Sequence, residues 1–183
     1  MTSPSTSPHA RPALAMALCA LMFVDLAGAA EQLLPAAGAL PAPACKLAIA
    51  NEPDAANLAH YRGQVVYVDF WASWCGPCRQ SFPFMNQLHS QLGDKGLAVL
   101  AINLDEEAED AQRFLASHPA QFRVAGGANQ ACASAFQVEA MPSSYLVDRN
   151  GRVRYIHHGF RAGDGQRLQE LAARLVAEPA TTP

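Results

Sequence analysis

Two cysteines separated by two residues, Cys75 and Cys78, constrain this chain more than any other feature. They directly follow the apolar run Val65–Trp71, and Pro77 between them suits the first turn of a helix. This order predicts a buried strand, a tight turn and a helix start, with the two sulfur atoms close enough to form a disulfide. A helix start stabilises a thiolate, and a thiolate, unlike a thiol, attacks disulfides. We therefore expect redox chemistry at Cys75, with Cys78 as its partner.

The same cysteine spacing is also half of a zinc site, and a zinc site needs a second pair of ligands. Cys45 and Cys132 stand far apart in the sequence. His157-His158 lacks the spacing of metal ligands, and we expect it at a solvated strand end. A strand before the cysteine pair and a proline-bearing helix start after it favour a redox site. We therefore expect neither a metal nor another cofactor there.

The first 29 residues have the features of a secretory leader. A weakly basic start precedes an apolar stretch from Ala13 to Val24, and Ala27-Gly28-Ala29 is a small-residue cleavage site. The apolar stretch is short for a membrane span, and Asp25 interrupts it. Cleavage is therefore favoured over an uncleaved anchor. We expect an exported, periplasmic protein, tethered to the membrane only if the leader is retained.

Removing those 29 of the 183 residues leaves 154, which is enough for one domain and too few for two. Residues 30–44 are rich in proline and alanine and show no helical or strand period, so we expect a linker there. The predicted domain then spans residues 45–179. The net charge of −3 gives no indication of a nucleic-acid partner.

Strand-like and helix-like segments alternate in the first half of this domain, and a hairpin around Asn150-Gly151 and a helix close it. Such an order predicts an α/β fold, a mixed sheet with helices on both faces. In the first long helix, one face at helical spacing is apolar and is expected to point inward: Phe82, Met85, Leu88 and Leu92. Pro83, inside the same helix, predicts a kink. The predicted strands are 45–49, 65–71, 97–104, 122–124, 143–148 and 152–157, and the predicted helices are 77–92, a helix capped by Asp105 and ended by His118-Pro119, 130–136 and 164–178.

Two segments carry a resemblance to a known family. Residues 68–79, Val-Asp-Phe-Trp-Ala-Ser-Trp-Cys-Gly-Pro-Cys-Arg, resemble the active-site segment of thioredoxins. Residues 141–151, which begin Met-Pro-Ser-Ser-Tyr, resemble the family's cis-proline loop and the hairpin after it. The leader and an extra strand–helix block at 97–122 narrow the resemblance to periplasmic thiol–disulfide oxidoreductases of the TlpA/ResA/DsbE type. The resemblance covers residues 45–178 and implies a thioredoxin fold with a strand–helix insertion.

The resemblance also implies roles for three residues at the centre of the site. Cys75 would be the exposed nucleophile, and Cys78, one turn into the helix and more buried, would resolve the mixed disulfide. In thioredoxins the acid at the position of Asp69 is buried behind the second cysteine. Burial raises the pKa of a carboxyl, so Asp69 can accept the proton of the resolving thiol near neutral pH.

A further group of residues is implied in substrate binding. Pro142 would follow a cis peptide bond, which proline makes accessible, and the backbone of Met141 would then pair with an extended substrate segment. Trp74 would shield the sulfur pair and contribute contact surface together with Gly76 and Pro77. The expected partners are protein thiols and disulfides.

Two details bear on the direction of the reaction. Members of this exported subfamily often carry a glutamate three residues after the second cysteine, and Ser81 stands there instead, so Asp69 is left to tune the cysteines. Gly76-Pro77 is the pair found in thioredoxin, a reducing couple. The resemblance thus favours a reductase that receives electrons from a membrane thiol relay, with the thiols of apocytochrome c as one target by family analogy.

Cys45 and Cys132 leave two alternatives open. The mature chain keeps four cysteines, and an even count in an exported protein permits a second disulfide, here between Cys45 and Cys132. The alternative is two unpaired cysteines, with Cys132 packed as a small apolar residue.

A second function from another class also remains. In a Cu(I)-handling metallochaperone, Cys75, Cys78 and Met141 would hold the ion, because soft sulfur ligands favour it. An oxidoreductase reduces a protein disulfide without metal, whereas a carrier binds Cu(I) in stoichiometric amount.

Overall fold

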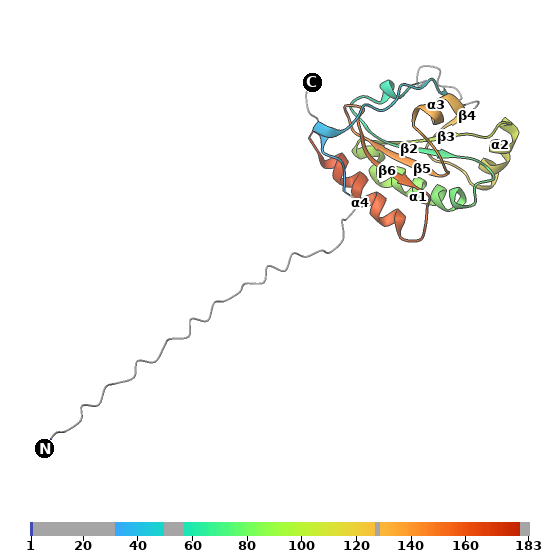
Figure 1. Cartoon of the computed structure of the whole chain (residues 1–183). Coiled ribbons are helices and arrows are strands. Elements are labelled where there is room, and N and C mark those ends of the chain that lie inside the picture. Colours follow the sequence, from blue (N-terminus) through green and yellow to red (C-terminus); the bar gives the residue numbers. More distant parts are fainter. Residues whose placement is uncertain (2–31, 50–56, 127–128, 180–183) are drawn as a thin grey trace. The chain divides into compact units, whose positions relative to one another are not determined.

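The computed structural model describes Met1 and residues 32–49, 57–126 and 129–179. The predicted leader, residues 1–29, lies outside these ranges apart from Met1. Six strands form one sheet in the order β1-β4-β3-β2-β5-β6 (Figure 1). The strands are β1 (Ala48–Ile49), β2 (Val65–Trp71), β3 (Leu97–Asn103), β4 (Arg123–Gly126), β5 (Ser143–Val147) and β6 (Val153–His158), and the α-helices are α1 (Gly76–Leu92), α2 (Ala108–Ser117), α3 (Gln130–Ala135) and α4 (Asp164–Ala177).

The sheet is mixed, as the sequence predicts. β3 pairs in parallel with β2 and β4, whereas β2–β5, β5–β6 and β1–β4 are antiparallel. α1 and α4 cover one face, and α3 lies on the other (Figure 1). β3, the strand of the predicted insertion, lies in the interior of the sheet between β4 and β2. The strands at that edge are β4 and β1.

β2 is buried along its whole length, because each of its faces packs against a separate apolar cluster. Val66, Val68 and Phe70 belong to the cluster on the α3 side, and Tyr67 and Trp71 belong to the cluster formed with α1 and α4. Side chains alternate along a strand. Asp69 therefore projects toward α1 and α4, and it is the one charged residue of this strand.

α1 follows β2 after a short turn, and Cys75 is its N-cap residue. The predicted inner face of this helix is confirmed, because Phe82, Met85, Leu88 and Leu92 are all buried. Phe84 is buried as well. Pro83 lies inside the helix, as predicted.

The prediction that Asp105 caps α2 is wrong. The N-cap residue of α2 is Glu107, two positions later. The carboxylate of Asp105 is instead occupied by the backbone N–H and the hydroxyl of Ser73, which precedes Cys75. A buried carboxylate satisfied by those donors has no orientation left for the first turn of a helix.

One of the two adjacent histidines differs from expectation. His158 is exposed, but His157 is buried, and its Nε2 lies 3.1 Å from Oδ2 of Asp164 at the start of α4. The alternation along β6 separates them, and α4 covers the side on which His157 lies. His157 therefore ties β6 to α4 and does not stand at a solvated strand end.

Part of the segment predicted as a linker packs along β6. Leu34 donates its N–H to the Arg154 carbonyl, and the Leu40 carbonyl accepts from the Val153 N–H. The guanidinium of Arg154, which also pairs with Glu178, donates to the Leu34 carbonyl. The packed domain therefore includes residues on the amino side of residue 45.

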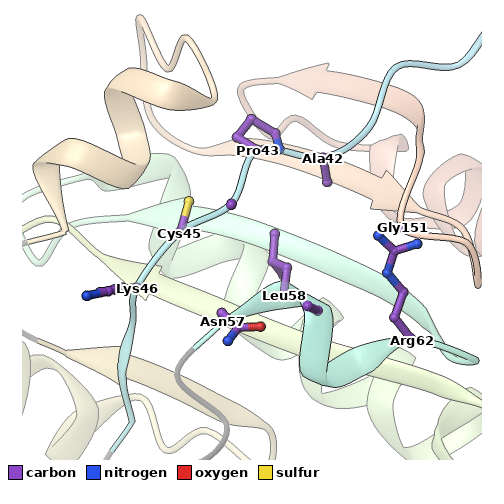
Figure 2. A pocket seen from close by; sticks show the side chains of 10 residues that line it. Ala42, Pro43, Cys45, Lys46, Asn57, Leu58, Arg62 and Gly151 are labelled. Atoms are coloured by element: carbon purple, nitrogen blue, oxygen red, sulfur yellow. The ribbon is translucent and has the colours of Figure 1, made fainter.

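Cys45 and Cys132 form a disulfide that joins the segment before β1 to α3, with Cα atoms 5.2 Å apart. Cys45 lies in the wall of a pocket between residues 42–46 and 57–62 (Figure 2). At the same pocket Arg62 lies close to Gly151, whose φ of +70° is a left-handed conformation that favours glycine. A side chain at Gly151 would also collide with the Arg62 guanidinium.

Replacing both Cys45 and Cys132 by alanine tests this cross-link. The disulfide spans 87 positions, so its loss frees a long loop in the unfolded chain, and we expect about 2–4 kcal/mol less stability in denaturant unfolding. The matched control is the double alanine variant of Cys75 and Cys78, whose loop spans 3 positions and whose loss costs less. Labelling of Cys45 and Cys132 by a thiol reagent in the oxidised native protein would contradict the pairing.

Candidate active site

The sheet register brings the two sequence motifs together at one edge. β2 and β5 are antiparallel, with Phe70 opposite Ser143 and Asp69 opposite Ser144. The end of β2, which leads to Cys75, therefore lies beside the start of β5, which follows Pro142. The peptide bond between Met141 and Pro142 is cis.

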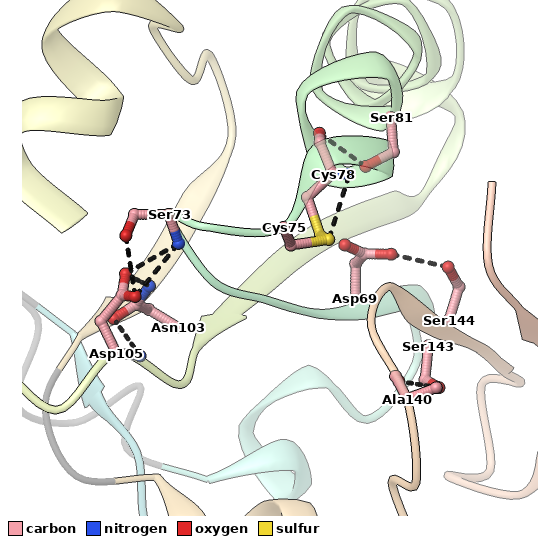
Figure 3. The surroundings of a disulfide bond; sticks show 10 residues. All are labelled: Asp69, Ser73, Cys75, Cys78, Ser81, Asn103, Asp105, Ala140, Ser143 and Ser144. Carbon is pink, nitrogen blue, oxygen red and sulfur yellow. Dashed lines mark hydrogen bonds between the residues drawn. A yellow bond between two sulfur atoms is a disulfide. The ribbon is translucent and has the colours of Figure 1, made fainter. Parts of the chain in front are cut away.

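Cys75 and Cys78 are joined by a disulfide across the first turn of α1, with Cα atoms 5.3 Å apart. The backbone N–H of Cys78 points at the Cys75 sulfur at 3.2 Å (Figure 3). The first sulfur thus occupies the N-cap position, where free N–H donors and the helix dipole favour negative charge. On reduction, this position stabilises a thiolate at Cys75.

The expectation that Cys75 is exposed needs correction. Its relative exposure is 4%, against 0% for Cys78, because both side chains belong to the apolar cluster of β2 and α1. Cys75 remains the more accessible of the two sulfurs. The exposed surface around it comes from Trp74, which is 72% exposed, and from Pro77.

Asp69 is fully buried and makes one hydrogen bond. Ser144 donates its hydroxyl to Oδ1 at 2.6 Å, and Oδ2 has no hydrogen-bond partner among the residues the structure describes. The carboxyl points toward the disulfide of Cys75 and Cys78 (Figure 3). Burial raises the pKa of Asp69 from 3.8 to about 7, and the Ser144 hydrogen bond opposes that rise. The carboxyl therefore exchanges a proton near neutral pH.

Sequence reasoning missed Ser144 and Tyr67. Tyr67 donates its hydroxyl to Oγ of Ser144 at 2.8 Å, and both side chains are buried. Burial, and secondarily the charge of Asp69, raises the pKa of Tyr67 well above its usual range, so its hydroxyl stays protonated. The alternation in β2 places Tyr67 on the same face as Asp69, but only the register of β5 reveals Ser144.

Asp105 does not cap a helix and instead anchors the turn before the cysteines. Both carboxylate oxygens accept from the Ser73 N–H, at 3.1 and 3.0 Å, and Oδ1 also accepts from the Ser73 hydroxyl. Asn103 at the end of β3 donates to Oδ2 at 2.8 Å. Asn129 donates in turn to the Asn103 carbonyl. These bonds attach the turn before Cys75 to the end of β3.

Ser81 is fully buried and donates its hydroxyl to the Cys78 carbonyl at 3.1 Å. Within the described ranges, no three His, Cys, Asp or Glu side chains gather in a way that could hold a metal ion. Nor do those ranges contain a helix both long and apolar enough to cross a membrane.

A sequence model of the Redoxin family matches residues 36–172. The chain belongs to the redoxin family. Thiol-disulfide oxidoreductase ResA of Geobacillus kaustophilus (strain HTA426) is 31% identical to this redoxin over 103 residues, which are 56% of this chain and 59% of ResA. The chain thus spans less than two thirds of the length of the curated relatives it matches.

Solved structures extend the comparison. A protein from Chlorobium tepidum, assigned as thiol:disulfide interchange protein DsbE, is 42% identical with a TM-score of 0.71, over 76% of this redoxin and 97% of the other chain. A secreted thiol-disulfide isomerase from Corynebacterium glutamicum is 22% identical with a TM-score of 0.71, over 85% and 97%. The second likeness shows the fold alone. The predicted thioredoxin fold and the resemblance to ResA and DsbE are confirmed.

Replacing Asp69 by asparagine tests the burial of this carboxyl through stability. A pKa near 7 in the folded state, against 3.8 in the unfolded chain, means that the neutral acid stabilises the fold fully below pH 3.8, and that this contribution is lost as pH rises through 7. Asparagine mimics the neutral form, so at pH 8.5 we expect the variant to be about 3–4 kcal/mol more stable than the wild type.

The measurement is denaturant unfolding of both oxidised proteins from pH 4 to pH 9. The difference between them should shrink toward zero at pH 4. Asp94→Asn, at an exposed acid in the short 3-10 helix that follows α1, is the matched control and should show a small difference at every pH. A stability difference between Asp69→Asn and the wild type that does not change with pH would show that burial does not raise the pKa of this carboxyl.

Proposed function

We propose that this redoxin is a thiol–disulfide oxidoreductase that acts on disulfides of exported proteins through Cys75 and Cys78. The observation that carries the proposal is the Cys75–Cys78 disulfide at the N-terminus of α1, with the buried carboxyl of Asp69 beside it. The names of the ResA and DsbE relatives support the same activity.

The reaction begins with the reduced pair. The Cys75 thiolate attacks one sulfur of a substrate disulfide, forms a mixed disulfide and displaces the first substrate thiolate. The Cys78 thiol then passes its proton to the Asp69 carboxylate. The Cys78 thiolate attacks the Cys75 sulfur and releases the second substrate thiolate. The substrate gains two electrons, and the protein returns to the disulfide form seen in Figure 3.

The substrate surface consists of residues on both motifs. Trp74, Gly76 and Pro77 flank the sulfur pair on the α1 side, and Met141 and Pro142 lie directly before β5. An extended substrate segment fits this edge, because the backbone around Met141 offers the pairing of one strand with another. Trp74 contributes the largest exposed apolar side chain of the site.

The proposed direction is reduction. Gly76 and Pro77 between the cysteines are the residues of a reducing couple, and a reductase outside the cytoplasm needs a membrane thiol relay as electron donor. A periplasmic location follows from the predicted leader, and thiols of apocytochrome c remain a proposed target by family analogy.

Substrate trapping tests the proposal. Cys78→Ala removes the resolving sulfur, so the variant should accumulate protein substrates as mixed disulfides on Cys75 when expressed with its leader in a Gram-negative host. Non-reducing electrophoresis and mass spectrometry identify the adducts. Cys75→Ala is the matched control and should trap far less. Absence of adducts on Cys78→Ala, together with no reduction of a protein disulfide by the reduced wild type, would rule out the function.

A further inference from the structure

We infer that Ser144, held in place by Tyr67, is a positioning residue that keeps the Asp69 carboxylate aimed at the sulfur pair and able to accept the proton of Cys78. This inference rests on the proposed function and extends it to two hydroxyl side chains that lie outside the active-site sequence motif.

The direction of the two hydrogen bonds carries the argument. Tyr67 donates to Oγ of Ser144 at 2.8 Å, so the Ser144 hydrogen is left to point at Oδ1 of Asp69 at 2.6 Å. A distance of 2.6 Å between two oxygens is typical of a hydroxyl that donates to a carboxylate. Oδ1 is thereby occupied, whereas Oδ2 has no hydrogen-bond partner in the described part of the chain. Oδ2 is the oxygen left to receive the proton of Cys78.

Neighbouring titratable groups act on this arrangement through Tyr67 rather than on Asp69 itself. Asp164 on α4 and Tyr155 on β6 both raise the pKa of Tyr67. Asp164 is paired with His157, whose ring stacks against Tyr155. On the α1 side, Asp69 faces the sulfur pair of Cys75 and Cys78.

The pKa of Asp69 responds to two causes, burial and the Ser144 hydroxyl. Burial alone would raise the pKa of Asp69 further and leave less carboxylate at pH 7. A hydroxyl that donates to the charged form offsets part of that rise. Ser144 thus keeps a usable fraction of Asp69 ionised at neutral pH, while burial keeps the carboxylate basic enough to accept a proton from a thiol.

The test is a direct titration of Asp69 by ¹³C NMR of its carboxyl carbon in the oxidised full-length chain. Ser144→Ala should raise the pKa of Asp69 by about one to two pH units, the usual strength of a hydrogen bond to a charged group. Tyr67→Phe should raise it less, because Ser144 keeps its hydroxyl. The double variant should shift no further than Ser144→Ala, because Tyr67 acts through Ser144.

Two matched controls each remove a side-chain hydroxyl that does not bond to Asp69 or Ser144. Ser143→Ala deletes a buried hydroxyl that donates to the Ala140 carbonyl, and Tyr145→Phe deletes one that donates to the Phe136 carbonyl. Neither should move the Asp69 titration. Ser144→Thr retains a hydroxyl and should titrate like the wild type, which keeps the test available if the alanine variant does not fold.

Each result decides the inference. An unchanged Asp69 titration in Ser144→Ala, or additive shifts in the double variant, overturns it. This readout needs no catalysis, so it is independent of the proposed function. The second readout is the pH profile of protein-disulfide reduction, whose rise with pH should move upward in Ser144→Ala by the same amount as the titration. A shifted titration in a protein without reductase activity would leave the hydrogen-bond assignment standing and remove the function.

Discussion

Burial of one carboxyl group, that of Asp69, is the constraint on which the site depends. β2 is covered on both faces, so a charge placed in it loses nearly all of its hydration. The hydroxyl of Ser144 compensates in part by donating to Asp69, and the pKa of Asp69 rises to about 7. An exposed acid at this position would stay ionised at neutral pH but would be too weak a base for a thiol proton. The stability lost to burial is thus the origin of the proposed basicity.

The surrounding fold places every other participant relative to that carboxyl. The parallel pairing of β2 with β3 brings Asp105 to Ser73, which fixes the turn before Cys75. The antiparallel pairing of β2 with β5 brings Ser144 opposite Asp69, and it sets the cis peptide before Pro142 at the same edge. Reactive groups near the carboxyl end of a central strand, with a helix starting beside them, recur in α/β folds for this reason.

The elements that could be predicted from the sequence are those that depend on local patterns. The apolar run of β2, the inner face of α1 and the hairpin around Asn150 and Gly151 follow from periodicity and turn chemistry. The partners of Asp69 and Asp105 could not be predicted, because both depend on strand register, which is a long-range property. Asp105 is an example. Its local sequence is typical of a helix cap, yet its carboxylate accepts from Ser73, 32 positions earlier. The burial of His157 likewise depends on α4 covering β6.

The central claim is that Asp69 accepts the proton of Cys78, and the most direct test is the rate at which the pre-reduced protein reduces a protein disulfide between pH 5.5 and pH 9. For the wild type, we expect the rate of the resolving step to rise with pH, with a midpoint near pH 7. For Asp69→Asn we expect loss of that rise and a rate at pH 7 lower by at least about tenfold. Equal rates and equal pH profiles for the two proteins would show that Asp69 does not accept this proton.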